Sequence, residues 1–119
     1  MDKALKYEDV CLIPEYSECN SRSECSTFTI FGGQQFKLPV VPANMKSVID
    51  AELAEWMSRN NYFYIMHRFD VDMLKFILNA QDWKCISISV GVKEDDFGLL
   101  VKAHSLKLKI HYITIDIAH

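Results

Sequence analysis

The stretch "CISISVGVKEDDFGLLVKAHSLKLKIHYITIDIA" (residues 85–118) decides the fold class, because two apolar runs in it flank a segment with helical spacing. The runs "CISISVGV" (85–92) and "HYITIDIA" (111–118) are rich in β-branched residues and have the character of buried strands. Between them, "EDDFGLLVKAHSL" (94–106) opens on acidic residues, which favour the start of a helix. This order predicts two parallel strands joined by a crossover helix.

The same rhythm precedes this stretch. "LPVVPAN" (38–44) and "YFYIMH" (62–67) are further strand candidates, and each is followed by a helical pattern, at residues 50–60 and 70–80. Both helices open on Asp, a natural N-cap. The strand centres recur roughly every 25 residues, the spacing of strand–helix units with short loops.

A different pattern occupies the first part of the chain. "STFTIF" (26–31) and "QQFKL" (34–38), separated by Gly32 and Gly33, predict a β-hairpin. The residues before this hairpin are polar and irregular, which is typical of an extended arm. We therefore expect an arm and hairpin over residues 1–37, followed by four strands and three helices over residues 38–119.

Two architectures fit these strand–helix units. One is a small open doubly wound sheet of the flavodoxin-like class, and the other is half of a (β/α)8 TIM barrel, which needs about 250 residues when complete. Periodicity alone does not choose between them. An open sheet normally covers its last strand with a final helix, so we expect this α/β chain to be part of a longer one. The barrel alternative predicts strand order 1-2-3-4 in one curved parallel sheet, with the helices on a single face.

Composition narrows the class of protein. The chain has 119 residues and a formal net charge of −3, which gives no electrostatic reason to expect nucleic acid or an anionic membrane as partner. No apolar run is long enough to span a bilayer, and the N-terminus lacks the order of a signal peptide. We therefore expect a cytoplasmic protein. The cysteines and histidines are scattered without metal-ligand spacing, so we expect no metal site and reduced thiols rather than disulfides.

Ligands of parallel α/β folds meet the C-terminal ends of strands. Asn44, Arg68 and Asp116 are polar residues at such ends and are candidates for one shared site. Each also has a structural interpretation: Asn44 could satisfy loop backbone, Arg68 could be a solvated charge, and Asp116 could cap a helix. Met45 is more typical of packing. No glycine-rich phosphate loop and no Ser-His-Asp or Cys-His constellation is visible.

Six segments together carry a resemblance to a known family. They are "KYEDVCLIP" (6–14), "NSRSE" (20–24), "LPVVPANM" (38–45), "NNYFYIMHRF" (60–69), "ISVGV" (88–92) and "YITIDIAH" (112–119). In this order they resemble the N-terminal part of GMP reductase, whose barrel fold is shared with IMP dehydrogenase. Residues 66–92 leave no room for the regulatory domain pair that IMP dehydrogenases usually carry. The resemblance thus favours a reductase, with a dehydrogenase lacking the insert as the alternative.

The resemblance implies NADPH-dependent reductive deamination of GMP to IMP and ammonia, a step of purine nucleotide salvage. The family's nucleophilic cysteine lies in a loop of the form G-x-G-P-G-x-x-C, which this sequence does not contain. Ser21 and Arg22 match a segment that reaches NADPH bound to a neighbouring subunit of the family's homo-oligomer, a tetramer. Arg68 matches a basic residue near the cofactor.

The resemblance also assigns the remaining candidates. Asp116, Ile117 and Ala118 match the strand end that lines the nicotinamide, and Asp116 with Arg68 would handle the proton that leaves with ammonia. Met45, with Asn44 before it, matches the side that packs on the purine. We expect the 119-residue chain alone to be inactive. The competing hypothesis is a non-catalytic α/β binding or scaffold module.

Overall fold

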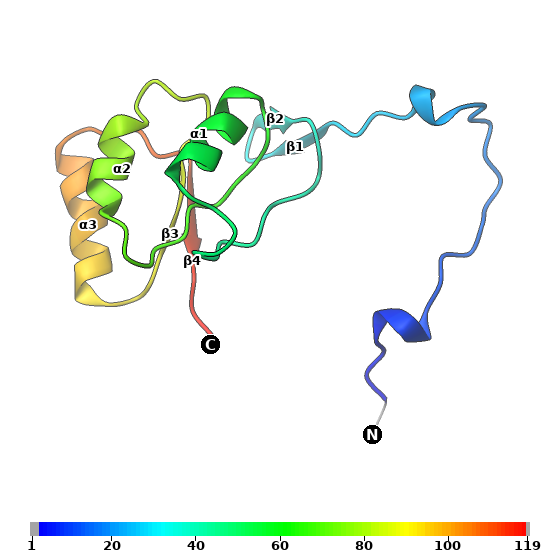
Figure 1. The fold of residues 1–119 in the computed structure, drawn as a ribbon, viewed down its shortest axis with the longest axis horizontal. Helices are drawn as coiled ribbons and strands as arrows, with labels where there is room; N and C mark the ends of the chain where they lie inside the picture. The colour runs from blue at the N-terminus through cyan, green and yellow to red at the C-terminus, as the bar shows by residue number, and fades with distance from the viewer. Residues whose placement is uncertain (1–2, 119) are drawn as a thin grey trace.

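The computed structural model describes residues 3–118 as an α/β body preceded by a long arm (Figure 1). His119, the last residue of the segment 112–119 that carries the resemblance, lies outside the described residues. The elements follow the order η1 (Tyr7–Asp9), η2 (Arg22–Glu24), β1 (Thr29–Phe31), β2 (Gln34–Phe36), α1 (Ala51–Arg59), α2 (Met73–Asn79), β3 (Ser87–Val90), α3 (Glu94–Ser105) and β4 (Tyr112–Ile115). None of the helices in this described part is long and apolar enough to cross a bilayer.

The predicted hairpin and arm are confirmed. β1 pairs with β2 in antiparallel register, with Thr29 opposite Phe36. Gly32 and Gly33 both have positive φ angles, 54° and 82°, as a tight two-residue hairpin turn requires. Before the hairpin, the chain runs through η1 and η2 as an exposed arm that extends away from the body (Figure 1).

The last three of the four predicted strands lie side by side in the predicted order 2-3-4. β3 pairs with β4 in parallel register, with Ile88 opposite Ile113, and Met66 forms a parallel bridge to Ile88 on the other side of β3. The strand predicted over residues 62–67 is therefore reduced to this one bridge. The chain forms no closed barrel within its described residues.

The first predicted strand, residues 38–44, is wrong: the structure assigns no strand there. Pro39 and Pro42 remove two of the backbone N–H donors that a ladder needs. Val40 and Val41, which gave the run its strand-like character, are exposed by 65% and 44%. The apolar run lies instead as an extended segment beside the hairpin, where Val40 and Val41 line one hollow with Phe36.

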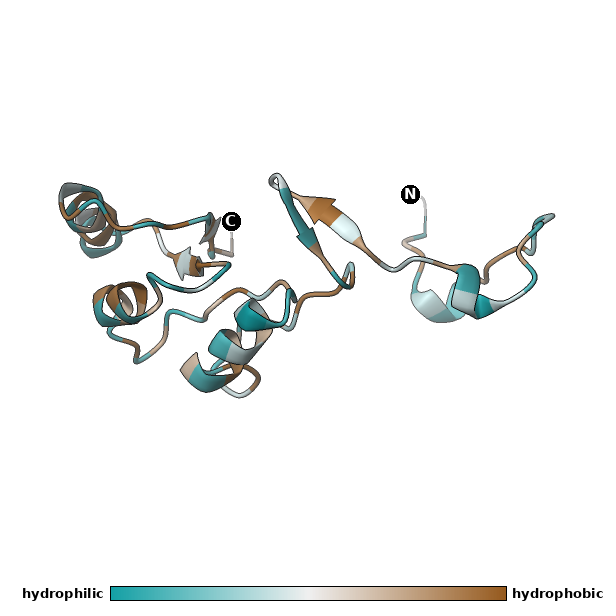
Figure 2. Cartoon of the chain, turned by 90° about the horizontal axis from the view of Figure 1, so that it is seen from above, coloured by the Kyte–Doolittle hydropathy of each residue, from teal (hydrophilic) through white to brown (hydrophobic). Residues whose placement is uncertain are grey.

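The three predicted helices are confirmed with ends shifted by up to three residues. Asp50 and Asp72 act as N-caps: their carboxylates accept hydrogen bonds from the backbone N–H groups of Leu53 (2.8 Å) and Lys75 (3.1 Å). Viewed from above, α1, α2 and α3 form an arc around the strands, and the hairpin lies on the other side (Figure 2). This arrangement matches helices on a single face of a curved sheet.

An aromatic cluster closes the edge of the sheet at which the strands begin. The Tyr112 ring, at the start of β4, stacks on Phe31 of the hairpin (centroids 5.4 Å apart) and meets Phe63 edge-on. Its hydroxyl donates a hydrogen bond of 2.6 Å to the Phe31 carbonyl. Because the hairpin covers the N-terminal ends of the strands, the C-terminal ends remain as the open edge.

Candidate functional site

The open edge brings together Arg68 and Asp116, which are 48 positions apart in the chain. Arg68 follows the Met66 bridge and Asp116 follows β4, so the two residues flank β3 from either side. Arg68 Nε donates to Asp116 Oδ2 at 3.2 Å, and Arg68 Nη2 donates to the Asp116 carbonyl at 3.0 Å. We call Arg68 and Asp116 the strand-end pair. Both side chains are about one-third exposed, so a ligand can reach them.

Backbone ladders hold the strand-end pair in place. The Asp116 N–H donates to the Val90 carbonyl at 2.8 Å, which extends the β3–β4 pairing by one residue beyond β4. On the other side of β3, the Ser89 N–H and Oγ both donate to the Met66 carbonyl, at 3.2 and 2.6 Å. These hydrogen bonds thus anchor Asp116, and Met66 two residues before Arg68, to β3.

Gly91 makes room for the guanidinium of Arg68. A β-carbon at Gly91 would lie 3.1 Å from Arg68 Nη1 and 2.8 Å from Asp96 Oδ2, both closer than ordinary van der Waals contact. Asp96 also accepts a hydrogen bond of 3.3 Å from the Lys93 N–H at the start of α3. The sequence singled out residues 89–92 as a strand end, but it gave no sign that Gly91 and Asp96 border Arg68, because spacing along the chain does not report this proximity.

Phe69 links the strand-end pair to the loop that carries Met45. The guanidinium carbon of Arg68 is 5.0 Å from the centroid of the Phe69 ring, within the range of a cation–π contact. Phe69 and Met45 line the same hollow, together with Lys46 and Ser47. Met45 is 55% exposed and is therefore available for contact with a ligand, whereas Asn44 beside it is half-buried.

The other predicted site residues are divided between the body and the arm. Ile117 and Ala118 continue from Asp116 as exposed residues of the open edge. Ser21 and Arg22 lie in the arm, where the Ser21 hydroxyl caps η2 by accepting from the Ser23 N–H at 3.2 Å. The structure therefore does not bring Ser21 and Arg22 to the strand-end pair (Figure 1).

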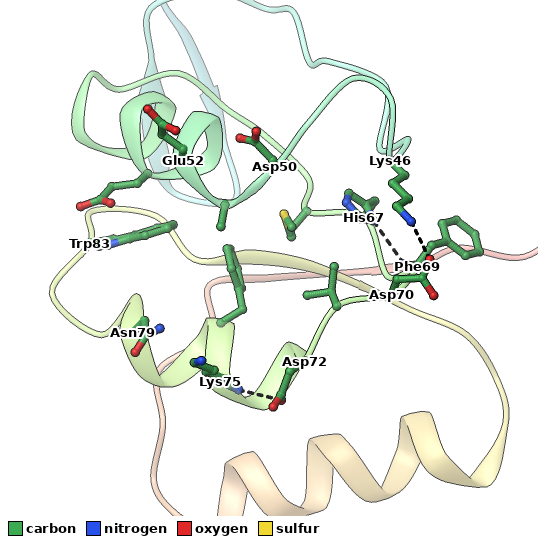
Figure 3. Close-up of a pocket in the computed structure, with 15 residues that line it drawn as sticks. Lys46, Asp50, Glu52, His67, Phe69, Asp70, Asp72, Lys75, Asn79 and Trp83 are labelled. Carbon is green, nitrogen blue, oxygen red and sulfur yellow. Dashed lines mark hydrogen bonds and ion pairs between the residues drawn. The ribbon is translucent and has the colours of Figure 1, made fainter.

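A hollow of about 640 Å³ is lined by residues of α1 and α2 (Figure 3). Its lining includes neither member of the strand-end pair. Several of its charged groups already have structural partners. Asp50 and Asp72 cap helices, and Asp70 accepts a 2.6 Å hydrogen bond from Lys46 Nζ, which lowers the pKa of Asp70. We therefore interpret this hollow as a groove between helices. No cluster of three His, Cys, Asp or Glu side chains suited to a metal ion occurs within residues 3–118.

Comparisons with known proteins agree on one family. The family model described as the IMP dehydrogenase / GMP reductase domain matches residues 4–75. The GMP reductases of Mycoplasma mycoides subsp. mycoides and Mesoplasma florum are 56% and 53% identical to this chain, over 98% of its length. The crystal structure of inosine 5′-monophosphate dehydrogenase from Legionella pneumophila superposes with a TM-score of 0.78 at 25% identity, over 98% of this chain and 36% of that one. The chain spans 37% of the length of each of the two GMP reductases.

Proposed function

Because the chain belongs to the IMP dehydrogenase / GMP reductase family, we propose that it is the N-terminal portion of a GMP reductase, an NADPH-dependent oxidoreductase that converts GMP to IMP and ammonia. Its identity of 47–56% to proteins named GMP reductase supports the reductase over the dehydrogenase. In this proposal, residues 38–118 supply the first strand–helix units of a (β/α)8 barrel.

The observation that carries the proposed chemistry is the strand-end pair. A carboxylate held by a guanidinium at the open edge is suited to hold the proton that leaves with ammonia. Arg68 keeps Asp116 oriented through its two hydrogen bonds, and Met45 offers an exposed apolar face for the flat purine. Asn44 would support Met45 in this loop.

The residues at the open edge also fit a phosphate-bearing nicotinamide cofactor. Arg68 has five N–H donors, and the contacts with Asp116 use those of Nε and Nη2, which leaves further donors for a phosphate or a ribose oxygen. Ile117, 46% exposed, and Ala118 offer apolar surface for the ring. When bound, the cofactor would supply the hydride. Ser21 and Arg22 of the arm would contact the cofactor of a neighbouring subunit in a homotetramer.

A chimaera tests the proposed function. In this chimaera, the 119-residue chain replaces the matching N-terminal segment of the Mycoplasma mycoides GMP reductase. The remainder of that reductase would supply the family's cysteine loop and the rest of the barrel. We expect GMP-dependent oxidation of NADPH by the chimaera and none by the 119-residue chain alone. A folded chimaera without this activity would favour a non-catalytic binding or scaffold module, and turnover by the chain alone would contradict our assignment of the nucleophile to another segment.

A further inference from the structure

Two cysteines of the arm lie in contact with each other. Cys19 Sγ and Cys25 Sγ are 3.6 Å apart, and both residues are exposed. They flank η2, the short turn that carries Arg22. The two remaining cysteines differ: Cys11 is exposed but has no sulfur partner among the described residues, and Cys85 is buried in the body.

Local hydrogen bonds already fold the segment between these sulfurs into a closed turn. The Asn20 N–H donates to Glu24 Oε2 at 3.1 Å, and the Cys25 N–H donates to the Arg22 carbonyl at 3.0 Å. Cys19 Sγ lies 3.0 Å from the Ser21 carbonyl, which orients the thiol inward over the turn. A disulfide requires the sulfurs to approach to about 2.05 Å, roughly 1.5 Å closer than they lie in this structure.

We propose that Cys19 and Cys25 form a redox modification site: a dithiol that closes to an intramolecular disulfide by exchange with a low-molecular-weight disulfide. One cysteine, as thiolate, attacks a sulfur of the small disulfide, whose S–S bond breaks and releases one small thiol. The second cysteine then attacks the mixed disulfide and releases the other small thiol. The two protein thiols lose two electrons, the small disulfide gains them, and the two protons pass to the released thiols.

The disulfide would enclose Ser21 and Arg22 in a ring from residue 19 to residue 25. The formation of this bond depends only on the geometry of the arm. Its consequence for the cofactor rests on the proposed function, because Ser21 and Arg22 are the arm residues expected to reach NADPH. Oxidation would hold η2 closed while leaving the strand-end pair unchanged, since that pair lies in the body (Figure 1).

The test uses oxidised glutathione as the small disulfide and the 119-residue chain as the protein. After incubation, free thiols are blocked with a maleimide and the tryptic peptides are analysed by mass spectrometry. We expect Cys19 and Cys25 to be joined, so that cleavage after Arg22 leaves two peptides that separate only after reduction. We also expect trypsin to cut after Arg22 several-fold more slowly in the oxidised chain.

Cysteine variants distinguish selective bonding of Cys19 with Cys25 from oxidation of any exposed cysteine. In Cys25→Ser, Cys19 should stop at the mixed disulfide with glutathione, and in the control Cys11→Ser the internal bond should form as in the parent chain. The exposed arm carries these positions, so the fold of the body is not at risk. Glutathione on both Cys19 and Cys25 without an internal bond, or equal linkage of Cys11 to either, would overturn the proposal. These outcomes do not depend on the activity of the chimaera.

Discussion

The strand-end pair should contribute a measurable coupling energy to the stability of the chain. We propose a double-mutant cycle with Arg68→Ala, Asp116→Asn and the double variant. At an Nε–Oδ2 distance of 3.2 Å and about one-third exposure of each side chain, solvent screens part of the attraction. We therefore expect a coupling of about 0.5–1 kcal/mol, the upper part of the range for exposed pairs.

The single variants should differ from each other. Asp116→Asn keeps the backbone carbonyl that accepts from Arg68 Nη2, so its cost should be about 1 kcal/mol or less. Arg68→Ala also loses that hydrogen bond, worth about 1 kcal/mol, and the contact with the Phe69 ring, worth about 0.5 kcal/mol. Its total cost should be about 2 kcal/mol.

The assay is urea unfolding followed by circular dichroism, at low and at high salt. The matched control is the pair Arg59–Asp82, whose side chains are 3.1 Å apart but 47% and 70% exposed. Its coupling should be close to zero. A strand-end coupling no larger than that of the control, or a larger cost for Asp116→Asn than for Arg68→Ala, would refute the reasoning.

Three further predictions concern single sites. In Gly91→Ala the new methyl group meets only the ends of flexible side chains. The free energy of unfolding measured in urea should therefore change by less than about 1 kcal/mol. The coupling energy of the strand-end pair should fall to that of the control pair Arg59–Asp82. Burial lowers the pKa of His111 below 6.5. The contribution of His111 to the free energy of unfolding should therefore be complete above about pH 6.5 and decrease as the pH falls toward the folded-state pKa. In urea titrations across that range, His111→Gln should make the free energy of unfolding less dependent on pH. Burial also raises the pKa of the Cys85 thiol to about 12. Iodoacetamide should therefore alkylate the three exposed cysteines of the reduced native chain rapidly and Cys85 only on unfolding. Fast labelling of Cys85 in the native chain would contradict its burial.

The sequence predicts the helices and the hairpin well, because their signals are local. Asp50 caps α1 where the sequence predicts, and Gly32–Gly33 supplies the positive φ angles of the turn. The N-cap of α2 is Asp72, two residues after Asp70, on which the predicted helix opens. The strand predicted over residues 38–44 is absent for a local reason, which the apolar composition of this segment does not reveal. Its prolines remove ladder donors, so β-branched character alone did not make a paired strand.

The site is predictable only in part. The rule that ligands meet strand C-terminal ends pointed to Arg68 and Asp116, and the parallel register of the strands then brings them into contact. Gly91 and Asp96 were missed as neighbours of Arg68, because their proximity depends on how α3 leaves β3. For Ser21 and Arg22, a cofactor role stays a prediction from the resemblance, since the arm holds them apart from the strand-end pair.

The most direct test of the proposed role of Asp116 is Asp116→Ala in the chimaera, with turnover and GMP affinity measured side by side and Asp82→Ala as the exposed control. Loss of a group that handles the departing proton should slow GMP deamination by roughly 10²-fold or more. GMP affinity should change much less, and the control should behave like the parent chimaera. A collapse of GMP affinity with unchanged turnover of bound substrate would show that Asp116 is a binding or structural residue, and would contradict the account.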